Sequence, residues 1–197
     1  RGDYSAARNH FEHILKYAID RKDSGLIGSS YGNIGNSYLY EKKTSLAIDH
    51  FLKALDIFEK KKNIKGIATV YGVLGNLYLS LDKYDMALNY YKKGLELFEK
   101  IGWKSYAATA MMNIGIIYKN KEEYNQAIDY FNKAHKIHLE LGNFLEAAKC
   151  IGNVGGVEFS RGNYYKSIEY HKKSLEALNK VNVTRDIGVS LMSIGVC

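Results

Sequence analysis

The sequence predicts an all-α solenoid of antiparallel helix pairs, and three observations support this prediction. Glycine returns every 40 positions along the 197 residues, at Gly35, Gly75, Gly115, Gly155 and Gly195. The apolar residues around each glycine recur at spacings of three and four, which gathers them on one face of a helix. Short polar breaks separate successive apolar stripes. A fixed period of this length is typical of a repeat array in which each unit buries its apolar face against its neighbours.

Two helices are expected in each repeat, and the second repeat shows them most clearly. An apolar stripe from Ile67 to Leu81 predicts one helix, and a stripe from Tyr84 to Phe98 predicts another. The break Leu81-Asp82-Lys83 is long enough only for a tight turn, so the two helices are antiparallel. We call them the first-type and second-type helices of a repeat. The corresponding turns lie at Glu41-Lys42-Lys43, Lys121-Glu122-Glu123 and Arg161-Gly162-Asn163.

Along the whole chain this pattern predicts one solenoid domain over 1–197 with about ten helices. The complete repeats occupy 24–63, 64–103, 104–143 and 144–183, with a lone second-type helix in 1–23 and a lone first-type helix in 184–197. Both terminal helices carry apolar stripes without the polar face that caps a solenoid. We therefore expect a fragment of a longer protein, able to self-associate through its uncapped terminal helices.

The recurring glycine predicts close helix packing. Glycine inside a helix costs about 1 kcal/mol relative to alanine, so its return at one phase indicates a close approach of the partner helix. Small residues recur at the facing phase of the second-type helix, at Ala47, Ala87, Ala127 and Ser167. We expect these residues to face the glycines.

Composition narrows the possible partners. The net charge of +7 and the 17 tyrosines raise the question of nucleic-acid binding. Most tyrosines lie at core phases, however, and the lysines cluster in turns and on outer faces among acidic residues, so no nucleic-acid partner is expected. No apolar run approaches the roughly 18 residues of a membrane span, which predicts no membrane insertion. The two cysteines, Cys150 and Cys197, are too few for a disulfide framework and favour a cytoplasmic protein with reduced thiols.

Residues for catalysis or metal binding do not group in the sequence. His135 and His138 share a helix face at a spacing of three, but no nearby cysteine or further histidine completes a metal site, and we interpret them as partly buried at a helix junction. The glycine-rich run from Gly152 to Gly156 lies inside an expected helix and not in a phosphate-binding loop. We expect no enzyme activity, no cofactor and no metal.

At the level of residues, the repeat resembles the tetratricopeptide repeat. The best match is the second repeat, with Tyr71-x-x-Leu74-Gly75-x-x-Tyr78 followed by Tyr84, Ala87 and Tyr91. The unit has 40 residues where the common form has about 34, and proline is absent, which is similar to the long-helix repeats of Pins-type spindle-orientation adaptors and of bacterial tetratricopeptide regulators such as the Rap type. The fourth repeat departs most from the pattern, at Glu158, Ser167 and His171. The resemblance implies a right-handed superhelix whose first-type helices line a concave groove.

The resemblance also locates the groove, on the face of each first-type helix opposite its apolar stripe. The expected peptide-binding residues are Asn33, Asn36, Tyr40, Thr69, Asn76, Thr109, Asn113, Asn120, Lys149 and Asn153. Asparagine amides carry two donors and an acceptor, which suits pairing with the backbone of an extended peptide. The alternative is that asparagine is merely tolerated on a solvated face. A second set of glycines, Gly32, Gly72 and Gly152, borders this face, and we interpret it as packing between successive first-type helices in preference to space for a ligand's main chain.

Two functions fit these features. The first is a non-enzymatic scaffold or adaptor that binds an extended peptide or protein segment in its groove. The alternative is a sensory or regulatory module of a larger signalling protein, such as a kinase, a cyclase or a transcription regulator. Only two charged residues stand out in the expected groove, Lys149 and, at its edge, Lys119. This argues against the variety of these repeats that binds a C-terminal carboxylate with several basic residues.

Overall fold

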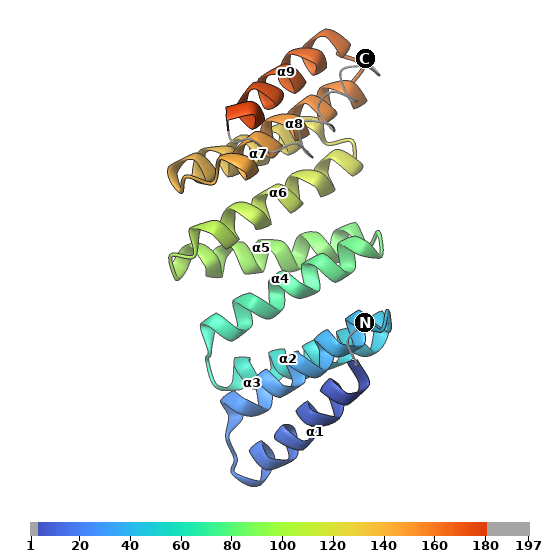
Figure 1. Ribbon diagram of the computed structural model, residues 1–197, viewed down its shortest axis with the longest axis vertical. Coiled ribbons are helices and arrows are strands. Elements are labelled where there is room, and N and C mark those ends of the chain that lie inside the picture. Colours follow the sequence, from blue (N-terminus) through green and yellow to red (C-terminus); the bar gives the residue numbers. More distant parts are fainter. Residues whose placement is uncertain (1–3, 181–197) are drawn as a thin grey trace. The chain divides into compact units, whose positions relative to one another are not determined.

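The computed structural model describes residues 4–180, and these residues form nine helices and no strand, as predicted for an all-α fold (Figure 1). The helices are α1 (Tyr4–Asp20), α2 (Ser24–Tyr40), α3 (Thr44–Lys60), α4 (Ile64–Ser80), α5 (Tyr84–Lys100), α6 (Lys104–Asn120), α7 (Tyr124–Glu140), α8 (Phe144–Ser160) and α9 (Tyr164–Lys180). The helix expected in 184–197 and the last recurring glycine, Gly195, lie outside the described residues. Within residues 4–180, no helix has the length and hydropathy that a membrane crossing requires.

A single turn geometry connects all the helices. Each described helix has 17 residues and three-residue turns connect successive helices, so the 40-residue repeat consists of two 20-residue halves. The middle residue of every turn has positive φ, at Lys22, Lys42, Lys62, Asp82, Gly102, Glu122, Gly142 and Gly162. In the turn between α2 and α3, the backbone N–H groups of Lys42 and Lys43 donate to the carbonyls of Leu39 and Tyr38, at 2.9 Å each. This pair of bonds satisfies the last carbonyls of the helix and reverses the chain.

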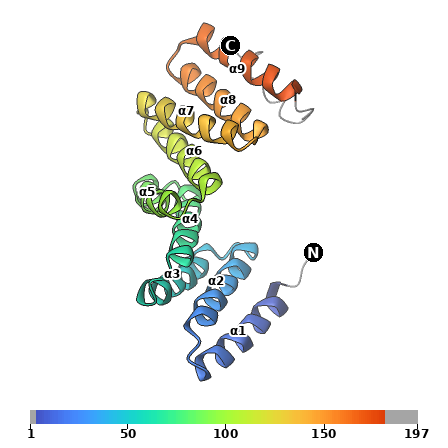
Figure 2. The ribbon, with the colours of Figure 1, turned by 90° about the vertical axis from the view of Figure 1, so that its left-hand side faces the viewer.

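The helices form two compact units, the first ending at Ile101 and the second beginning at Gly102. In the first unit α1 packs on α2, α2 on α3, α3 on α4 and α4 on α5. In the second, α6 packs on α7, α7 on α8 and α8 on α9. Figure 2 shows the antiparallel course of successive helices within each unit. Each unit is therefore a stack of helix pairs joined by neighbour contacts, as the sequence pattern predicted.

The recurring glycines lie where an aromatic ring of the partner helix crosses them. A Cβ at Gly75 would lie 2.8 Å from the ring of Tyr91, and one at Gly115 would lie 2.7 Å from the ring of Phe131. The alanines expected to face the glycines are fully buried, but the ring is the nearer neighbour. The glycine is therefore required mainly by the aromatic residue 16 positions later in each repeat.

The fourth repeat keeps this packing with different residues. Ser167 is fully buried at the alanine position, and His171 occupies the ring position beside Gly155. Glu158 is 5% exposed where other repeats have tyrosine, and its carboxylate accepts a 2.7 Å hydrogen bond from Nδ2 of Asn163. Burial, with a smaller contribution from the charge of Lys119, lowers the pKa of His171.

Candidate functional site

A cavity of about 460 Å³ lies in the first unit between the first-type helices α2 and α4, with α3 beneath. Its lining residues are Gly28, Ser29, Gly32, Asn33, Asn36, Phe51, Phe58, Asn63, Lys65, Gly66, Thr69, Val70 and Val73. Five of them, Ser29, Asn33, Asn36, Thr69 and Val73, belong to the faces that the sequence places opposite the apolar stripes. We call this cavity the α2–α4 groove.

The structure keeps the predicted groove residues out of the core. Asn33, Asn36, Asn76, Thr69, Thr109, Asn120 and Tyr40 are exposed, and Asn113, Lys149 and Asn153 are half-buried. Asn33, Asn36 and Thr69 come together in the α2–α4 groove, whereas Tyr40 and Asn76 do not line it. Thr109, Asn113 and Asn120 lie on α6 of the second unit, and Lys149 and Asn153 lie on α8.

Several of these side chains already have intramolecular partners. Oδ1 of Asn76 accepts a 2.5 Å hydrogen bond from the hydroxyl of Tyr91 on α5, which fixes the orientation of the amide. The hydroxyl of Thr69 donates to the carbonyl of Lys65 at 2.9 Å, one turn earlier in α4. Hydroxyls committed in this way can still accept a hydrogen bond from a ligand but are poor donors to it.

Two further predicted residues, Lys149 and Tyr40, also contact neighbouring side chains. Nζ of Lys149 lies 3.0 Å from Oε1 of Glu146 in an ion pair on α8, so its charge is partly neutralised. The ring of Tyr40 stacks on that of Tyr4 from α1, with centroids 4.8 Å apart. Tyr40 is nevertheless 67% exposed, so its outer face is accessible.

Gly32 differs from the other members of the second glycine set. A Cβ at Gly72 would lie 3.4 Å from the ring of Phe98, and one at Gly152 would lie 3.3 Å from Oγ of Ser174, so both positions are packed. A Cβ at Gly32 would meet no atom within 4 Å, because the residue opens onto the α2–α4 groove. Phe98 and Ser174 lie on the second-type helices α5 and α9, so Gly72 and Gly152 are packed, but not between successive first-type helices as expected. At Gly32 the packing interpretation is wrong.

The two histidines of α7 lie at a helix junction, as expected. Nδ1 of His135 lies 2.9 Å from the carbonyl oxygen of Ala147 on α8. His138 is 1% exposed, and neither of its ring nitrogens has a hydrogen-bond partner. Burial lowers its pKa, so the neutral ring is favoured. Within residues 4–180, no three potential metal ligands come together, and the thiol of Cys150 is buried with its pKa raised to about 12.

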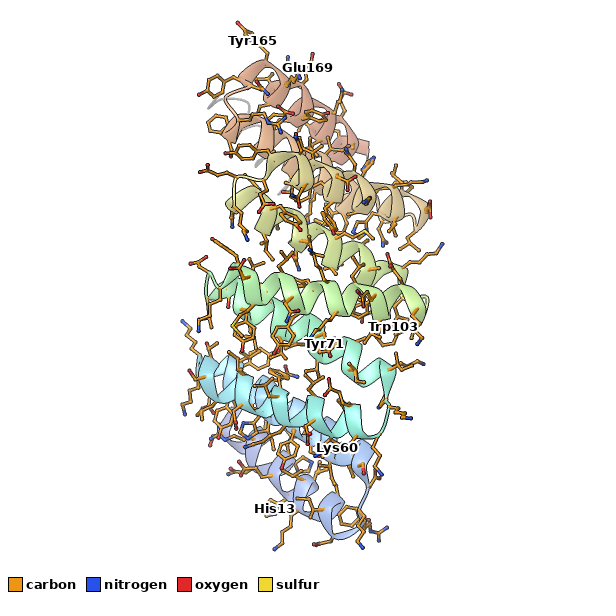
Figure 3. The ribbon with its side chains drawn as sticks, turned by 180° about the vertical axis from the view of Figure 1, so that it is seen from behind. His13, Lys60, Tyr71, Trp103, Tyr165 and Glu169 are labelled. Atoms are coloured by element: carbon orange, nitrogen blue, oxygen red, sulfur yellow. The ribbon has the colours of Figure 1, made fainter. Side chains whose placement is uncertain are left out.

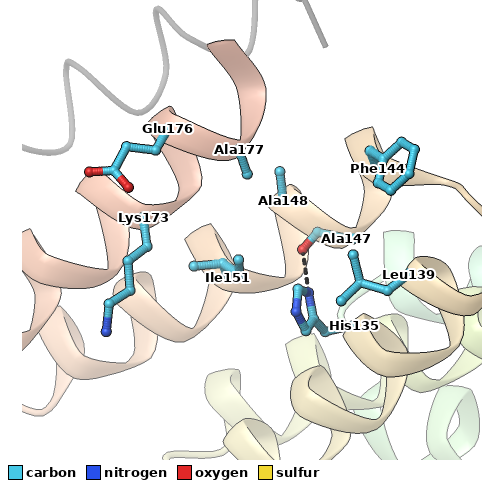
Figure 4. A pocket seen from close by; sticks show the side chains of 9 residues that line it. All are labelled: His135, Leu139, Phe144, Ala147, Ala148, Ile151, Lys173, Glu176 and Ala177. Carbon is cyan, nitrogen blue, oxygen red and sulfur yellow. Dashed lines mark hydrogen bonds between the residues drawn. The ribbon is translucent and has the colours of Figure 1, made fainter. Parts of the chain in front are cut away.

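A second cavity, of about 470 Å³, lies in the second unit on the side of the second-type helices. Figure 4 shows Ala147, Ala148 and Ile151 of α8 at its floor, with α7 on one side and α9 on the other. The other lining residues are His135, Leu139, Phe144, Lys173, Glu176 and Ala177. We call it the α7–α9 cavity. Sequence reasoning did not find it, although comparison of equivalent positions between repeats contains the signal, since Ile151 and Ala177 are smaller than their counterparts Tyr71 and Leu97.

Comparison with known families and structures identifies the repeat. The family model described as "Tetratricopeptide repeat" matches three overlapping stretches, residues 26–100, 66–140 and 106–180. These stretches begin at 40-residue intervals, which is the period read from the glycines. No curated protein sequence matches the chain.

Three solved structures illustrate the structural likeness. BtubC (BKLC) from P. vanneervenii is 16% identical, with a TM-score of 0.79 over 100% of this chain and 83% of its own. A Signal Transduction ATPase with Numerous Domains from Pyrococcus horikoshii, described as having a tetratricopeptide repeat sensor, is 18% identical, with a TM-score of 0.82 over 95% of this chain and 29% of its own. A Rap protein complexed with Competence and Sporulation Factor is 16% identical, with a TM-score of 0.68 over 93% of this chain and 57% of its own. At these identities the likeness concerns the fold.

Proposed function

Because the chain belongs to the tetratricopeptide repeat family, we propose that it is a non-enzymatic interaction scaffold that binds an extended peptide or protein segment along its first-type helices. The observation that supports this proposal most is the α2–α4 groove, which combines open space with the exposed amides of Asn33 and Asn36. Its volume of about 460 Å³ is within the range of ligand sites, about 300–1,000 Å³.

The groove suits a main chain more than a bulky ligand. The amides of Asn33 and Asn36 are exposed one turn apart on α2, and each can donate to a peptide carbonyl and accept from a peptide N–H. Gly32 lines the groove beside Asn33 and has no Cβ, so a backbone can approach the helix closely there. Phe51 and Phe58 contribute apolar walls from α3 below. These features favour an extended segment that places one apolar side chain on the rings.

The charge of the groove favours a ligand that is neutral or weakly acidic. Lys65 is the one charged residue among those that line the α2–α4 groove, and it is exposed at the start of α4. A single exposed lysine adds steering and little affinity. Specificity is therefore expected to come from the amides and the apolar wall.

Peptide selection against the purified chain tests this proposal. Displayed random peptides are selected on the wild-type chain, and the affinities of the enriched peptides are measured by calorimetry for the wild type and for a variant with Asn33, Asn36, Asn76 and Asn113 changed to alanine. Circular dichroism and thermal melting verify that the variant is folded. We expect the variant to lose at least about tenfold in affinity, because each lost net hydrogen bond contributes about 0.5–1.5 kcal/mol.

A matched pair of variants separates the groove from the rest of the surface. Gly32→Leu fills the α2–α4 groove and should abolish binding of the selected peptides. The control, Gly142→Asn, alters a turn residue with positive φ, at a conformation asparagine tolerates, and should leave binding unchanged. Equal peptide affinity of the wild type, the fourfold asparagine variant and Gly32→Leu would contradict the proposal and show that the peptide binds elsewhere.

A regulatory module is the second candidate function. Its support is the likeness to the structure described as a signal transduction ATPase with a tetratricopeptide repeat sensor, of which this chain spans 29%. In that case the groove and the helix ends would hold an effector domain of the same protein. The full-length gene sequence tests this, since a kinase, cyclase or DNA-binding domain next to the repeats would favour regulation over a free-standing scaffold.

A further inference from the structure

The α7–α9 cavity has a counterpart in the first unit that a tyrosine side chain fills. Tyr71, on α4, extends between α3 and α5, with its hydroxyl donating to Oε1 of Glu59 at 3.1 Å. Its Cβ lies 3.4 Å from where a Cβ at Gly94 of α5 would be, and Nζ of Lys93 lies over its ring, 5.8 Å from the centroid. Figure 3 marks Tyr71 at this position. The site between two second-type helices thus holds a phenol in the first unit.

Smaller side chains open the same site in the second unit. Equivalent residues of the second and fourth repeats lie two 40-residue periods apart, so Ile151 replaces Tyr71 and Ala177 replaces Leu97. Ala147 likewise stands where the second repeat has Ile67. These smaller side chains are among those that line the cavity of about 470 Å³.

The polar groups of the cavity are suited to a phenol. Lys173, the counterpart of Lys93, lines the cavity, and its Nζ lies over the ring of Tyr170, 5.3 Å from the centroid. Short movement of this flexible side chain would place its ammonium over a guest ring, as Lys93 lies over Tyr71.

The side chain that could accept a hydrogen bond from a phenol hydroxyl also differs between the two sites. Leu139 replaces Glu59, which removes the carboxylate that Tyr71 uses, and His135 replaces Leu55 on the same helix face. Because Nδ1 of His135 lies 2.9 Å from the carbonyl oxygen of Ala147, Nδ1 is the donor of that contact, and in this tautomer Nε2 is an acceptor. The cavity therefore offers an apolar floor, a cation at Lys173 and two side-chain acceptors, Nε2 of His135 and the carboxylate of Glu176.

We propose that the α7–α9 cavity is a receptor for a tyrosine side chain presented by a partner protein. The guest ring lies on Ala147, Ile151 and Ala177, Lys173 covers its face, and its hydroxyl donates to Nε2 of His135. This surface is separate from the α2–α4 groove, so the protein can hold two partners or two parts of one partner.

Protein-observed NMR with p-cresol, the tyrosine side-chain analogue, and toluene tests the recognition chemistry. We expect p-cresol to shift the methyl resonances of Ala147, Ile151 and Ala177 with a Kd of about 1 mM. Toluene should bind about three- to tenfold more weakly, because it lacks the hydroxyl. Absence of shifts at these methyls, or equal binding of both probes, would overturn the proposal.

Two variants assign the effect to the cavity. Ile151→Tyr restores the residue of the second repeat, fills the cavity from within and should abolish p-cresol binding while raising the melting temperature. His135→Leu restores the residue of the second repeat without filling the cavity and should make p-cresol and toluene bind equally. Unchanged p-cresol binding in the folded Ile151→Tyr variant would contradict the assigned site.

A tyrosine-containing peptide distinguishes the source of the phenol. The peptide acetyl-Ala-Tyr-Ala-amide should compete with p-cresol and shift the same methyls, and the phenylalanine version should compete about three- to tenfold less. If p-cresol binds and the peptide does not, the cavity is a site for a free phenolic molecule and the proposal of a partner side chain is wrong.

Discussion

The hydroxyl of Tyr91, on α5, donates a 2.5 Å hydrogen bond to Oδ1 of Asn76 on α4. Tyr91 is 2% exposed, so a core residue fixes the direction of an exposed amide on the predicted peptide-binding face. The equivalent residues of the neighbouring repeats, Phe51 and Phe131, have no hydroxyl. In the second repeat, packing beneath the first-type helix therefore sets the orientation of an asparagine.

Changing Tyr91 to phenylalanine should remove this orientation without removing the ring. We expect the free energy of unfolding to fall by about 0.5–1.5 kcal/mol, the net value of one hydrogen bond. Affinity for peptides that depend on Asn76 should fall as well, and chemical denaturation and calorimetry measure the two effects. Tyr84→Phe is the control, since the hydroxyl of Tyr84 donates to Oδ1 of the exposed Asp82 at 3.1 Å. An equal loss in both variants would show that Tyr91 does not act through Asn76.

Two glycines of α2 should respond to alanine in opposite ways. A Cβ at Gly28 would lie 2.5 Å from the ring of Phe58, so Gly28→Ala should destabilise the first unit by about 1–3 kcal/mol through overpacking. Gly32→Ala places its methyl in open space and should stabilise α2 by about 0.5–1 kcal/mol. Thermal melting of the two variants checks this prediction. Destabilisation by both would mean that Gly32 is packed.

The same Gly32→Ala variant should weaken peptide binding while it stabilises the fold. The added methyl projects into the α2–α4 groove where a main chain is expected to lie closest to the helix. Calorimetry with a selected peptide measures the change. Stabilisation with unaltered affinity would show that the ligand does not approach Gly32.

The turns offer a test that is independent of function. Glu122 has a φ of 61°, a left-handed conformation that costs a non-glycine residue about 1–2 kcal/mol. Glu122→Gly should therefore stabilise the chain by about 1 kcal/mol, after the greater entropy loss of glycine is subtracted. Gly142→Ala, at a φ of 71°, should destabilise it by about 1 kcal/mol. Melting temperatures that shift in the same direction for both variants would contradict this reasoning.

His138 should make the second unit sensitive to acid. The ring is buried, neither nitrogen has a partner, and burial lowers its pKa, with a smaller opposing effect from Glu146. Since the folded-state pKa lies below that of the unfolded chain, about 6.5, the unfolded state binds the proton more readily. Stability is then fully present above about pH 6.5 and falls as the pH decreases through that value.

His138→Phe introduces the residue found at Phe58 and Phe98 and should remove this contribution. We expect stabilisation by about 1–3 kcal/mol at pH 7.5, because two unsatisfied buried nitrogens disappear. The gain should be larger at pH 5.5, because the wild type then loses stability as His138 is protonated on unfolding. The variant should keep some acid sensitivity, because His171 is a second buried histidine with a lowered pKa. Urea unfolding at the two pH values measures both quantities. The same pH dependence in wild type and variant would show that His138 does not contribute to acid sensitivity.

The candidate sites could be predicted only in part. The 40-residue phase placed Asn33, Asn36 and Thr69 on a common face, and these residues line one cavity. The phase could not reveal that Lys149 pairs with Glu146, because side-chain pairing depends on rotamers. It also missed the α7–α9 cavity, since a cavity arises from the joint volumes of side chains on three helices and no single helix contains it.

The sequence by itself determined the helices, their order and the faces they bury. Helical periodicity and the glycine phase are local properties, so they predicted a second-type helix within 1–23, and the structure has α1 at Tyr4–Asp20. Which glycine is packed and which is open was decided only by tertiary structure. Gly32 and Gly72 share one phase, but Phe58 turns its ring toward Gly28 and Gly66, whereas Phe98 lies against Gly72. The direction of a buried ring depends on the space left by residues of other helices, and sequence periodicity carries no information about that space.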